Sequence, residues 1–120
     1  MDSRALGQWG EQQAARFLRR KGYSIVARNF RCRAGEIDIV AKGKGYVVFA
    51  EVKLRKSDEF AEAREFVTAA KQRRIISTAL LWLRDNPDAL QPRFDVLEVY
   101  APDGQKTLRP EINHIEDAFC

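Results

Sequence analysis

Asp38, Glu51 and Lys53 have the residue types and the spacing that metal-assisted chemistry requires. Two carboxylates supply the oxygen ligands that Mg²⁺ or Mn²⁺ prefers, and these cations leave their other positions to water and substrate phosphate. The carbonyl group of Val52 would add a further oxygen ligand. A lysine beside such a cation can orient an attacking water or stabilise charge on a scissile phosphate. The pattern therefore favours phosphodiester hydrolysis.

Two predicted strands must position these side chains. Residues 36–42 and 46–54 are rich in β-branched and aromatic residues, and the Gly-Lys-Gly sequence at 43–45 between them is typical of a hairpin turn. In the second strand, both alternating faces are apolar up to residue 50, which predicts a central strand covered on both sides. Glu51 and Lys53 then follow on one face, at the end of a buried element.

The length of the hairpin turn decides how close Asp38 lies to Glu51. Side chains alternate with a period of two, so the two carboxylates share a face only if the paired residue numbers have an odd sum. A two-residue turn would place Asp38 opposite Phe49 and diagonal to Glu51, whereas a four-residue turn, 43–46, would place it directly opposite Glu51. Cβ separations would be roughly 5 to 8 Å. Either register allows both carboxylates to share one cation.

The chain resembles a known family through this hairpin. Gly-Glu-Ile-Asp-Ile-Val-Ala at 35–41 and Phe-Ala-Glu-Val-Lys at 49–53 are similar to the Asp…Glu-x-Lys signature of the restriction-endonuclease-like superfamily. The resemblance is closer to the YraN family of bacterial proteins, which are related to archaeal Holliday junction resolvases. It covers nearly the whole chain, with further matching segments at 10–11, 22–23, 28–29, 71–74, 93–96, 114–115 and 118–119.

The resemblance implies roles for residues outside the hairpin. In resolvase-like nucleases a glutamate of the first helix joins the metal site, and Glu11 matches that glutamate in order and context. In the same superfamily the helix after the Glu-x-Lys strand brings a polar side chain to the active centre, which makes Lys71 or Gln72 a candidate. The competing interpretation for each is a solvated charge on a helix flank.

The rest of the chain predicts an α/β fold. Residues 3–21 form a helix that Gly22 ends, and Glu11 falls about 20° from Leu18, at the edge of the apolar face. After this helix we expect a strand at 23–30 and a basic turn at 31–34, and beyond the hairpin a polar loop at 55–62. A second helix is predicted to start between 62 and 68 and to end near 85. A strand at 93–100 and a short edge strand between 108 and 119 complete the prediction. We expect one domain, 1–120, with a restriction-endonuclease-like core: a mixed sheet flanked by helices in the order α-β-β-β-α-β-β.

Basic residues are concentrated in the first third of the chain. The net charge is +4, and residues 1–34 hold eight Lys or Arg against two acidic residues. Clustered cations gain affinity for polyanions by releasing phosphate counterions, so a nucleic acid, with DNA preferred, is the expected partner; a solubilising surface is the alternative. The candidate nucleic-acid-binding residues are Arg16, Arg19, Arg20, Arg28, Arg31, Arg33, Lys71 and Arg74.

Other chemically active residue types carry less weight. Asp95 lies outside the Asp…Glu-x-Lys arrangement, and we expect it to pair with a basic neighbour. His114 lacks partners at zinc-ligand spacing and is interpreted as structural. Cys32 and Cys120 make no metal or disulfide pattern. No apolar run reaches the roughly 18 residues that span a bilayer, and a signal-peptide segment is missing, so we expect a cytoplasmic protein without membrane contact.

Three functional hypotheses follow. The first is a Mg²⁺- or Mn²⁺-dependent nuclease that acts on DNA, including branched or junction DNA, with Asp38, Glu51 and Val52 as ligands, Lys53 at the water and Glu11 as an auxiliary carboxylate. Cutting both strands of a symmetric junction would call for a homodimer. The second is a nucleic-acid-binding protein that keeps the nuclease fold without hydrolysis. The third makes the charges structural ion pairs only.

Overall fold

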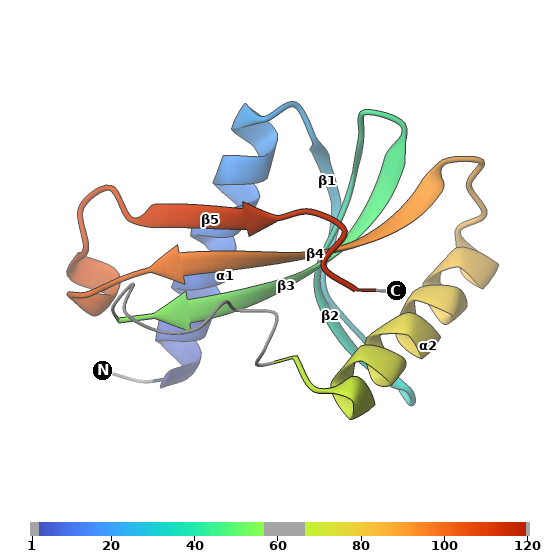
Figure 1. Cartoon of the computed structure of the whole chain (residues 1–120), viewed down its shortest axis with the longest axis horizontal. Coiled ribbons are helices and arrows are strands. Elements are labelled where there is room, and N and C mark those ends of the chain that lie inside the picture. Colours follow the sequence, from blue (N-terminus) through green and yellow to red (C-terminus); the bar gives the residue numbers. More distant parts are fainter. Residues whose placement is uncertain (1–2, 57–66, 120) are drawn as a thin grey trace.

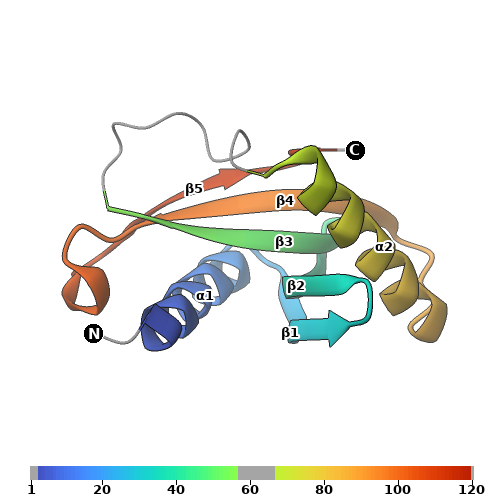
Figure 2. The same cartoon turned by 90° about the horizontal axis from the view of Figure 1, so that it is seen from below.

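One mixed sheet lies between two helices. The computed structural model describes residues 3–56 and 67–119. The elements are α1 (Ser3–Arg20), β1 (Ser24–Cys32), β2 (Gly35–Gly43), β3 (Tyr46–Arg55), α2 (Ala69–Asp85), β4 (Gln91–Tyr100), a short 3-10 helix η2 (Gly104–Lys106) and β5 (Glu111–Ile115). The strands lie in the order β1-β2-β3-β4-β5, with only β3 and β4 parallel. Figures 1 and 2 show α1 and α2 packed against the sheet. The predicted α/β class and the order α-β-β-β-α-β-β are confirmed.

The central strand β3 is covered on both faces, as its sequence predicted. Val47 and Phe49 pack in the apolar cluster that contains Ile75 of α2. Their neighbour Val48 packs in the second cluster, with Leu18 of α1. The period-two alternation of a strand thus feeds two separate cores, and each core fixes one helix against the sheet. Glu51 continues the face that α2 covers.

The β2–β3 hairpin combines features of the two predicted registers. Gly43 pairs with Tyr46, so only Lys44 and Gly45 form the turn. Both have positive φ, 55° and 87°, as the two central residues of a type I′ hairpin turn require. The pairing nevertheless has the register of the predicted four-residue turn, because Ile39 lies opposite Ala50. Asp38 and Glu51 are therefore the next residues on the two strands.

The predicted basic turn at 31–34 was too long. Arg31 pairs with Glu36 and Cys32 with Gly35, so both belong to β1, and only Arg33 and Ala34 connect the strands. The predicted loop at 55–62 was wrong at its first residue, because Arg55 lies in β3. Positions 57–62 of that loop lie outside the described residues.

Helix α2 begins one residue after the predicted window and ends as predicted. The Thr68 side chain caps it by accepting a hydrogen bond from Lys71 N, and Asn86 is the C-cap. Two apolar residues of α2 lie outside its buried face, because Ala70 is exposed and Leu80 is 63% exposed. Thr78 is buried instead; its hydroxyl donates to the carbonyl of Arg74 at 2.7 Å, which satisfies its polar group.

Helix α1 approaches β3 closely at Gly10. A Cβ atom on Gly10 would lie 2.9 Å from Cδ2 of Leu54, so the helix can be this near the strand only because the residue has no side chain. The next residue is Glu11, so the close approach of α1 to β3 also sets the distance between the backbone of Glu11 and the sheet.

No helix in the described part of the chain is long and apolar enough to cross a membrane.

Candidate functional site

Asp38 and Glu51 lie where β2 and β3 separate. Ile39 and Ala50 form the last pair of the ladder, and beyond it the backbone N–H of Val52 donates to Oδ2 of Asp38 at 2.8 Å. The Asp38 carboxylate thus takes the place of a backbone acceptor between the diverging strands. Glu51 is buried, with 7% of its surface exposed. The structure brings together the two carboxylates that the sequence predicted as a pair.

The negative charge of Glu51 disfavours ionisation of Asp38. Burial, followed by the charge of Glu51, raises the pKa of Asp38 to about 8, against the lowering effect of the Val52 N–H. Glu11 raises it further. Like charges in a poorly solvated position cannot both ionise without a compensating cation. Asp38 therefore keeps its proton to a higher pH than an ordinary aspartate does.

Two lysines approach Glu51. Nζ of Lys53 lies 3.7 Å from Oε1 of Glu51, and Lys71, in the first turn of α2, forms an ion pair with the same oxygen. Burial lowers the pKa of Lys53, and the hydrogen bond and charge of Lys71 lower it further. For Lys71 burial also lowers the pKa, but the hydrogen bond and charge of Glu51 outweigh it, and the pKa is raised. The two lysines are thus unequal: Lys71 is held cationic and Lys53 gives up its proton more readily.

Glu11, which the resemblance assigned to the metal site, lies near this group, because its charge acts on Asp38. Burial raises its pKa, while a side-chain hydrogen bond with Asn29 and the charge of Arg28 lower it. Nη2 of Arg28 is 4.0 Å from Oε1, too far for a hydrogen bond, and that buried oxygen has no hydrogen-bond partner. The charge of Glu51 also acts on Glu11. An oxygen in this state is available to a water or a cation.

The residues fit a divalent cation that is shared with substrate. Among the described residues, no group of three or more His, Cys, Asp or Glu side chains could hold a metal ion. Mg²⁺, however, is commonly bound by one or two carboxylates and completes its shell with water and phosphate. The raised pKa of Asp38 and the Glu11 oxygen that accepts no hydrogen bond are the two features that such a cation would relieve.

Gln72, the second helix candidate, does not join the carboxylates. Its side-chain amide donates to the carbonyl of Val67 at 2.9 Å and closes the start of α2. Lys71 is the residue of the pair that α2 brings to the carboxylates. Lys71 also lines, with Arg74, a cavity of about 440 Å³ over Asp38 and Glu51, which we call the site cavity.

The predicted basic residues, apart from Arg33, fall into two groups. Arg28 and Arg31 pair with Glu11 and Glu36, and Lys71 and Arg74 line the site cavity, so these four surround the carboxylates. Arg33 lies exposed in the turn between β1 and β2. The other group consists of the exposed residues Arg16, Arg19 and Arg20 in the second half of α1.

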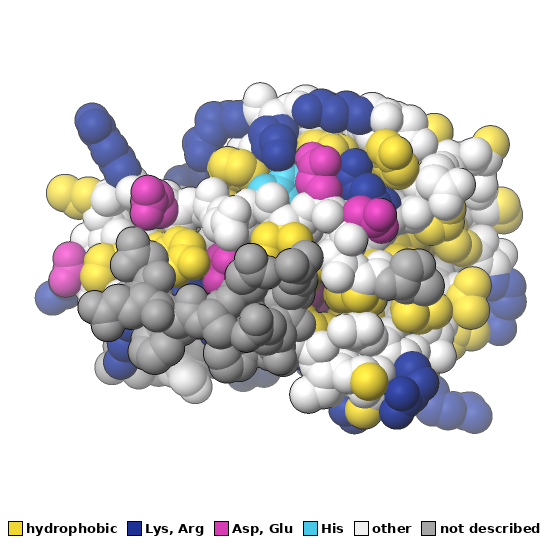
Figure 3. Space-filling model, in the orientation of Figure 1, with side chains coloured by type: hydrophobic (Ala, Val, Ile, Leu, Met, Phe, Trp, Pro, Cys, Tyr) yellow, Lys and Arg dark blue, Asp and Glu magenta, His cyan; other side chains and the backbone are white. Residues whose placement is uncertain are grey.

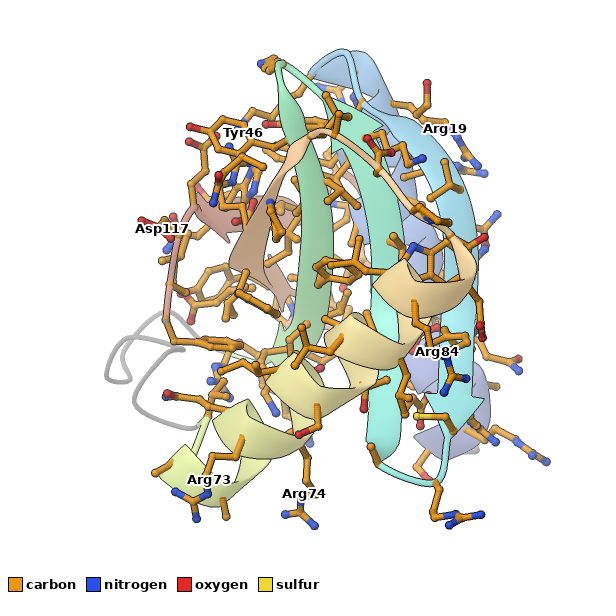
Figure 4. The ribbon with its side chains drawn as sticks, turned by 90° about the vertical axis from the view of Figure 1, so that its right-hand side faces the viewer. Arg19, Tyr46, Arg73, Arg74, Arg84 and Asp117 are labelled. Carbon is orange, nitrogen blue, oxygen red and sulfur yellow. The ribbon has the colours of Figure 1, made fainter. Side chains whose placement is uncertain are left out.

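The figures separate these groups. In Figure 4, Arg73 and Arg74 project from the start of α2 at one end of the molecule, and Arg19 lies at the other. Figure 3 shows Lys and Arg side chains along the upper rim of the molecule, where Figure 1 places the connection between α1 and β1. The basic residues of the first third therefore do not form one surface around the carboxylates.

Asp95 is a structural carboxylate, and the prediction that it pairs with a basic side chain is confirmed. Arg93 donates to both of its oxygens, at 2.9 and 2.8 Å, and Asp117 N donates at 3.0 Å. Burial raises the pKa of Asp95, but hydrogen bonds from His114 and Arg93 outweigh burial, and the pKa is lowered. Fully buried and fully paired, Asp95 ties β4 to the C-terminal segment.

His114 belongs to the same network. Its Nε2 lies 2.7 Å from Oδ2 of Asp95, and its Nδ1 lies 2.8 Å from Nζ of Lys21. Lysine only donates hydrogen bonds, so Nδ1 accepts and Nε2 carries the proton that it donates to Asp95. With 2% of its side chain exposed, His114 occupies a structural position, in agreement with its interpretation from the sequence.

The sequence analysis did not single out Asn29. Its side chain hydrogen-bonds to Glu11 and its φ is 54°, although it lies within β1. The sequence carries two signals at this position: the family match at 28–29, and the tolerance of asparagine for the left-handed region, which exceeds that of other non-glycine residues. Asn29 thus orients a candidate site residue from a strained strand position.

Comparisons with known proteins place the chain in a family. The model of "Uncharacterised protein family UPF0102" matches residues 10–99. A UPF0102 protein of Caldanaerobacter subterraneus subsp. tengcongensis is 41% identical over 99% of this chain and 98% of its own length. One of Symbiobacterium thermophilum is 49% identical over 89% and 92%, respectively, and one of Geotalea daltonii 46% over 98% and 91%. The chain belongs to the protein family UPF0102, which is the YraN family.

Proposed function

We propose that this protein hydrolyses phosphodiester bonds of nucleic acid, with Mg²⁺ or Mn²⁺ bound between Asp38 and Glu51. The observation that carries the proposal is the raised pKa of Asp38, about 8, beside a buried Glu51. A cation bound between the two carboxylates would favour the ionised form of Asp38. The site cavity, which Lys71 and Arg74 line, gives a phosphate access to that position.

The proposed mechanism divides the work among four side chains. Asp38 and Glu51 hold the cation, and the carbonyl of Val52 is proposed as a further ligand. When bound there, the cation supplies Lewis acidity toward the scissile phosphate and lowers the pKa of an attacking water. Lys53, whose pKa is lowered, accepts or orients the proton of that water. Lys71, whose pKa is raised, stays cationic and stabilises charge that develops on the phosphate.

Glu11 has an auxiliary role in this proposal. Its free oxygen, Oε1, is placed to accept a hydrogen bond from a water near the carboxylates. Asn29 hydrogen-bonds to the carboxyl group, and Nη2 of Arg28 lies 4.0 Å from the same Oε1. Glu11→Gln would keep the size of the side chain and remove the charge, so it would lower the rate less than a change at Glu51.

The test is cleavage of labelled DNA and RNA. Duplex, single-stranded, flap and four-way-junction DNA and structured RNA are incubated with Mg²⁺, Mn²⁺ or EDTA, with native protein, Glu51→Gln and Lys53→Ala. We expect cutting that needs the cation and falls at least about 100-fold in both variants, which is about 2.7 kcal/mol of barrier. Arg73→Ala, a change at an exposed residue of α2, is the control and should cut like the native protein.

The alternative function predicts a different result. If nothing is cut, but the native protein, Glu51→Gln and Lys53→Ala bind nucleic acid with equal affinity and equal salt dependence, the hydrolysis proposal is wrong and the binding-protein alternative remains.

A preference for DNA junctions would call for two copies of the site. Sedimentation of the protein with a junction would then show two chains per junction.

A further inference from the structure

Three cavities run in a row from the carboxylates along α1. The site cavity shares Glu36 with a second cavity of about 320 Å³, which Gln8 and Asn29 also line. Gln8 and Asn29 in turn line a third cavity of about 400 Å³, together with Trp9. Neighbouring cavities share lining residues and therefore lie side by side, and we call the three together the α1 path. Figure 2 shows the β1–β2 hairpin lying between α2 and α1, and the path crosses that hairpin.

The chemistry of the α1 path changes along its length. At the site cavity it is ionic, with Lys71 and Arg74 beside the carboxylates. Arg31 in the second cavity is 69% exposed, and its pair with Glu36 is a surface pair of little strength, so it can turn to a phosphate. The third cavity has amides and one aromatic ring, from Gln12, Asn29 and Trp9. The second cavity has Arg4 and Arg31 together with Glu11 and Glu36, so cations accompany the path beside acidic residues, and an aromatic residue stands at its far end.

Trp9 is held in place by the core. It is half-buried and packs against the apolar cluster of α1, which also contains Ala14 and Leu18. The same residue also lines the third cavity. A fixed aromatic face beside basic groups is the arrangement on which unpaired bases stack. The exposed amides of Gln8 and Gln12 can hydrogen-bond base edges, which are accessible only when the bases are unpaired.

We propose that the α1 path binds an unpaired strand of nucleic acid, with one base stacked on Trp9 and the strand's phosphates following Arg31 and Arg74 toward the carboxylates. This proposal deepens the proposed function. It rests on that function only for the position of the scissile phosphate, because binding of the strand does not require cleavage. A duplex would contact the cations through its phosphates, but it would leave Trp9 and the two glutamines without a base to bind.

The test measures binding in EDTA, where no cutting interferes. A labelled single strand of about 12 nucleotides and a duplex of the same sequence are titrated with the full chain, and anisotropy gives both dissociation constants. We expect Trp9→Leu to weaken binding of the single strand about tenfold and binding of the duplex less than twofold, because stacking on one base is lost. Trp9→Phe, which keeps an aromatic face, should bind within about threefold of the native protein.

Two further comparisons guard against a folding effect at Trp9. Gln8 is exposed, so Gln8→Ala leaves the core intact, and it should weaken only the single strand, by roughly fivefold. Arg74→Ala and Arg73→Ala remove the same charge from neighbouring positions, of which only Arg74 lines the site cavity. Arg74→Ala should weaken single-strand binding at least threefold more than Arg73→Ala.

The outcomes separate this proposal from the proposed function. The α1 path is wrong if the single strand does not bind, or if Trp9→Leu and Gln8→Ala leave its affinity unchanged or weaken duplex binding equally. Such a result together with metal-dependent cutting would leave the nuclease proposal intact. The expected binding contrast without any cutting would support the α1 path and reject the nuclease proposal. A peptide ligand that competes for the path in place of the single strand would also overturn it.

Discussion

Lys71 of α2 forms an ion pair with Glu51 of β3, and this contact joins the helix to the carboxylate pair. The same lysine lowers the pKa of Lys53 through a hydrogen bond and its charge. Lys71 thus acts on two neighbours: its charge compensates that of Glu51, and it favours loss of a proton from Lys53. The contact depends on Thr68, which caps α2 by accepting a hydrogen bond from Lys71 N and so sets where the first turn begins.

Replacing Lys71 should change the pH dependence of cleavage. In Lys71→Met the burial of Lys53 remains, but the hydrogen bond and charge that lower its pKa are gone. The pKa of Lys53 should rise, so the fraction in the neutral form falls at a given pH. We expect the rising limb of the pH–rate profile to move to higher pH, in single-turnover cleavage. Arg73→Met serves as control; an unshifted limb in Lys71→Met would show that Lys53 does not transfer the proton.

Asp38 should make the folded protein less stable as the pH rises. Its pKa is raised to about 8 in the fold, against an ordinary value of 3.8. Its contribution is complete below about pH 4 and is lost progressively up to about pH 8, at no more than about 1.4 kcal/mol per pH unit. The free energy of unfolding of the native protein, minus that of Asp38→Asn, should therefore fall between pH 5 and pH 8 in urea titrations without divalent cations. A constant difference would contradict the raised pKa.

Removing the charge of Asp95 should destabilise the protein strongly. Asp95→Asn leaves Arg93 buried with only part of its pairing, and it also disturbs the bond to His114. Breaking one partner of a buried pair costs about 3 to 5 kcal/mol. The matched control is Asp85→Asn, whose side chain is 63% exposed and pairs with Arg84 on the surface; it should cost less than about 1 kcal/mol. Urea unfolding gives the free energy of unfolding of both variants. Equal losses of stability would reject the structural role of Asp95.

Two glycines of α1 should respond in opposite directions to the same substitution. Gly10→Ala places a Cβ 2.9 Å from the Leu54 side chain, and such overpacking costs about 1 to 3 kcal/mol. At Gly7 a Cβ would meet nothing within 4 Å, so Gly7→Ala should stabilise the helix by up to about 1 kcal/mol. Thermal unfolding measures both. Stabilisation by Gly10→Ala would show that α1 does not need its close approach to β3.

The sequence alone predicted the hairpin and its pair of carboxylates, because both rest on local regularities. Alternation with a period of two places Asp38 and Glu51 on one face, provided that the register has an odd sum. Gly43, Lys44 and Gly45 marked the turn between the strands. The 3.6-residue period of α1 likewise predicted that Glu11 lies at the edge of its buried face, where its side chain is 15% exposed.

The tertiary structure decided what depends on contacts between distant segments. Charge counting grouped Arg19 with Arg28, but a rise of about 1.5 Å per residue carries the end of α1 well away from Glu11. The ion pair of Lys71 with Glu51, and the raised pKa of Asp38, depend on how α2 and α1 close over the sheet. Burial and the distance between charges set these energies, and both arise only when the chain is folded. Residue types and local periods therefore predicted which groups could react, and packing decided which of them lie together and in which protonation state.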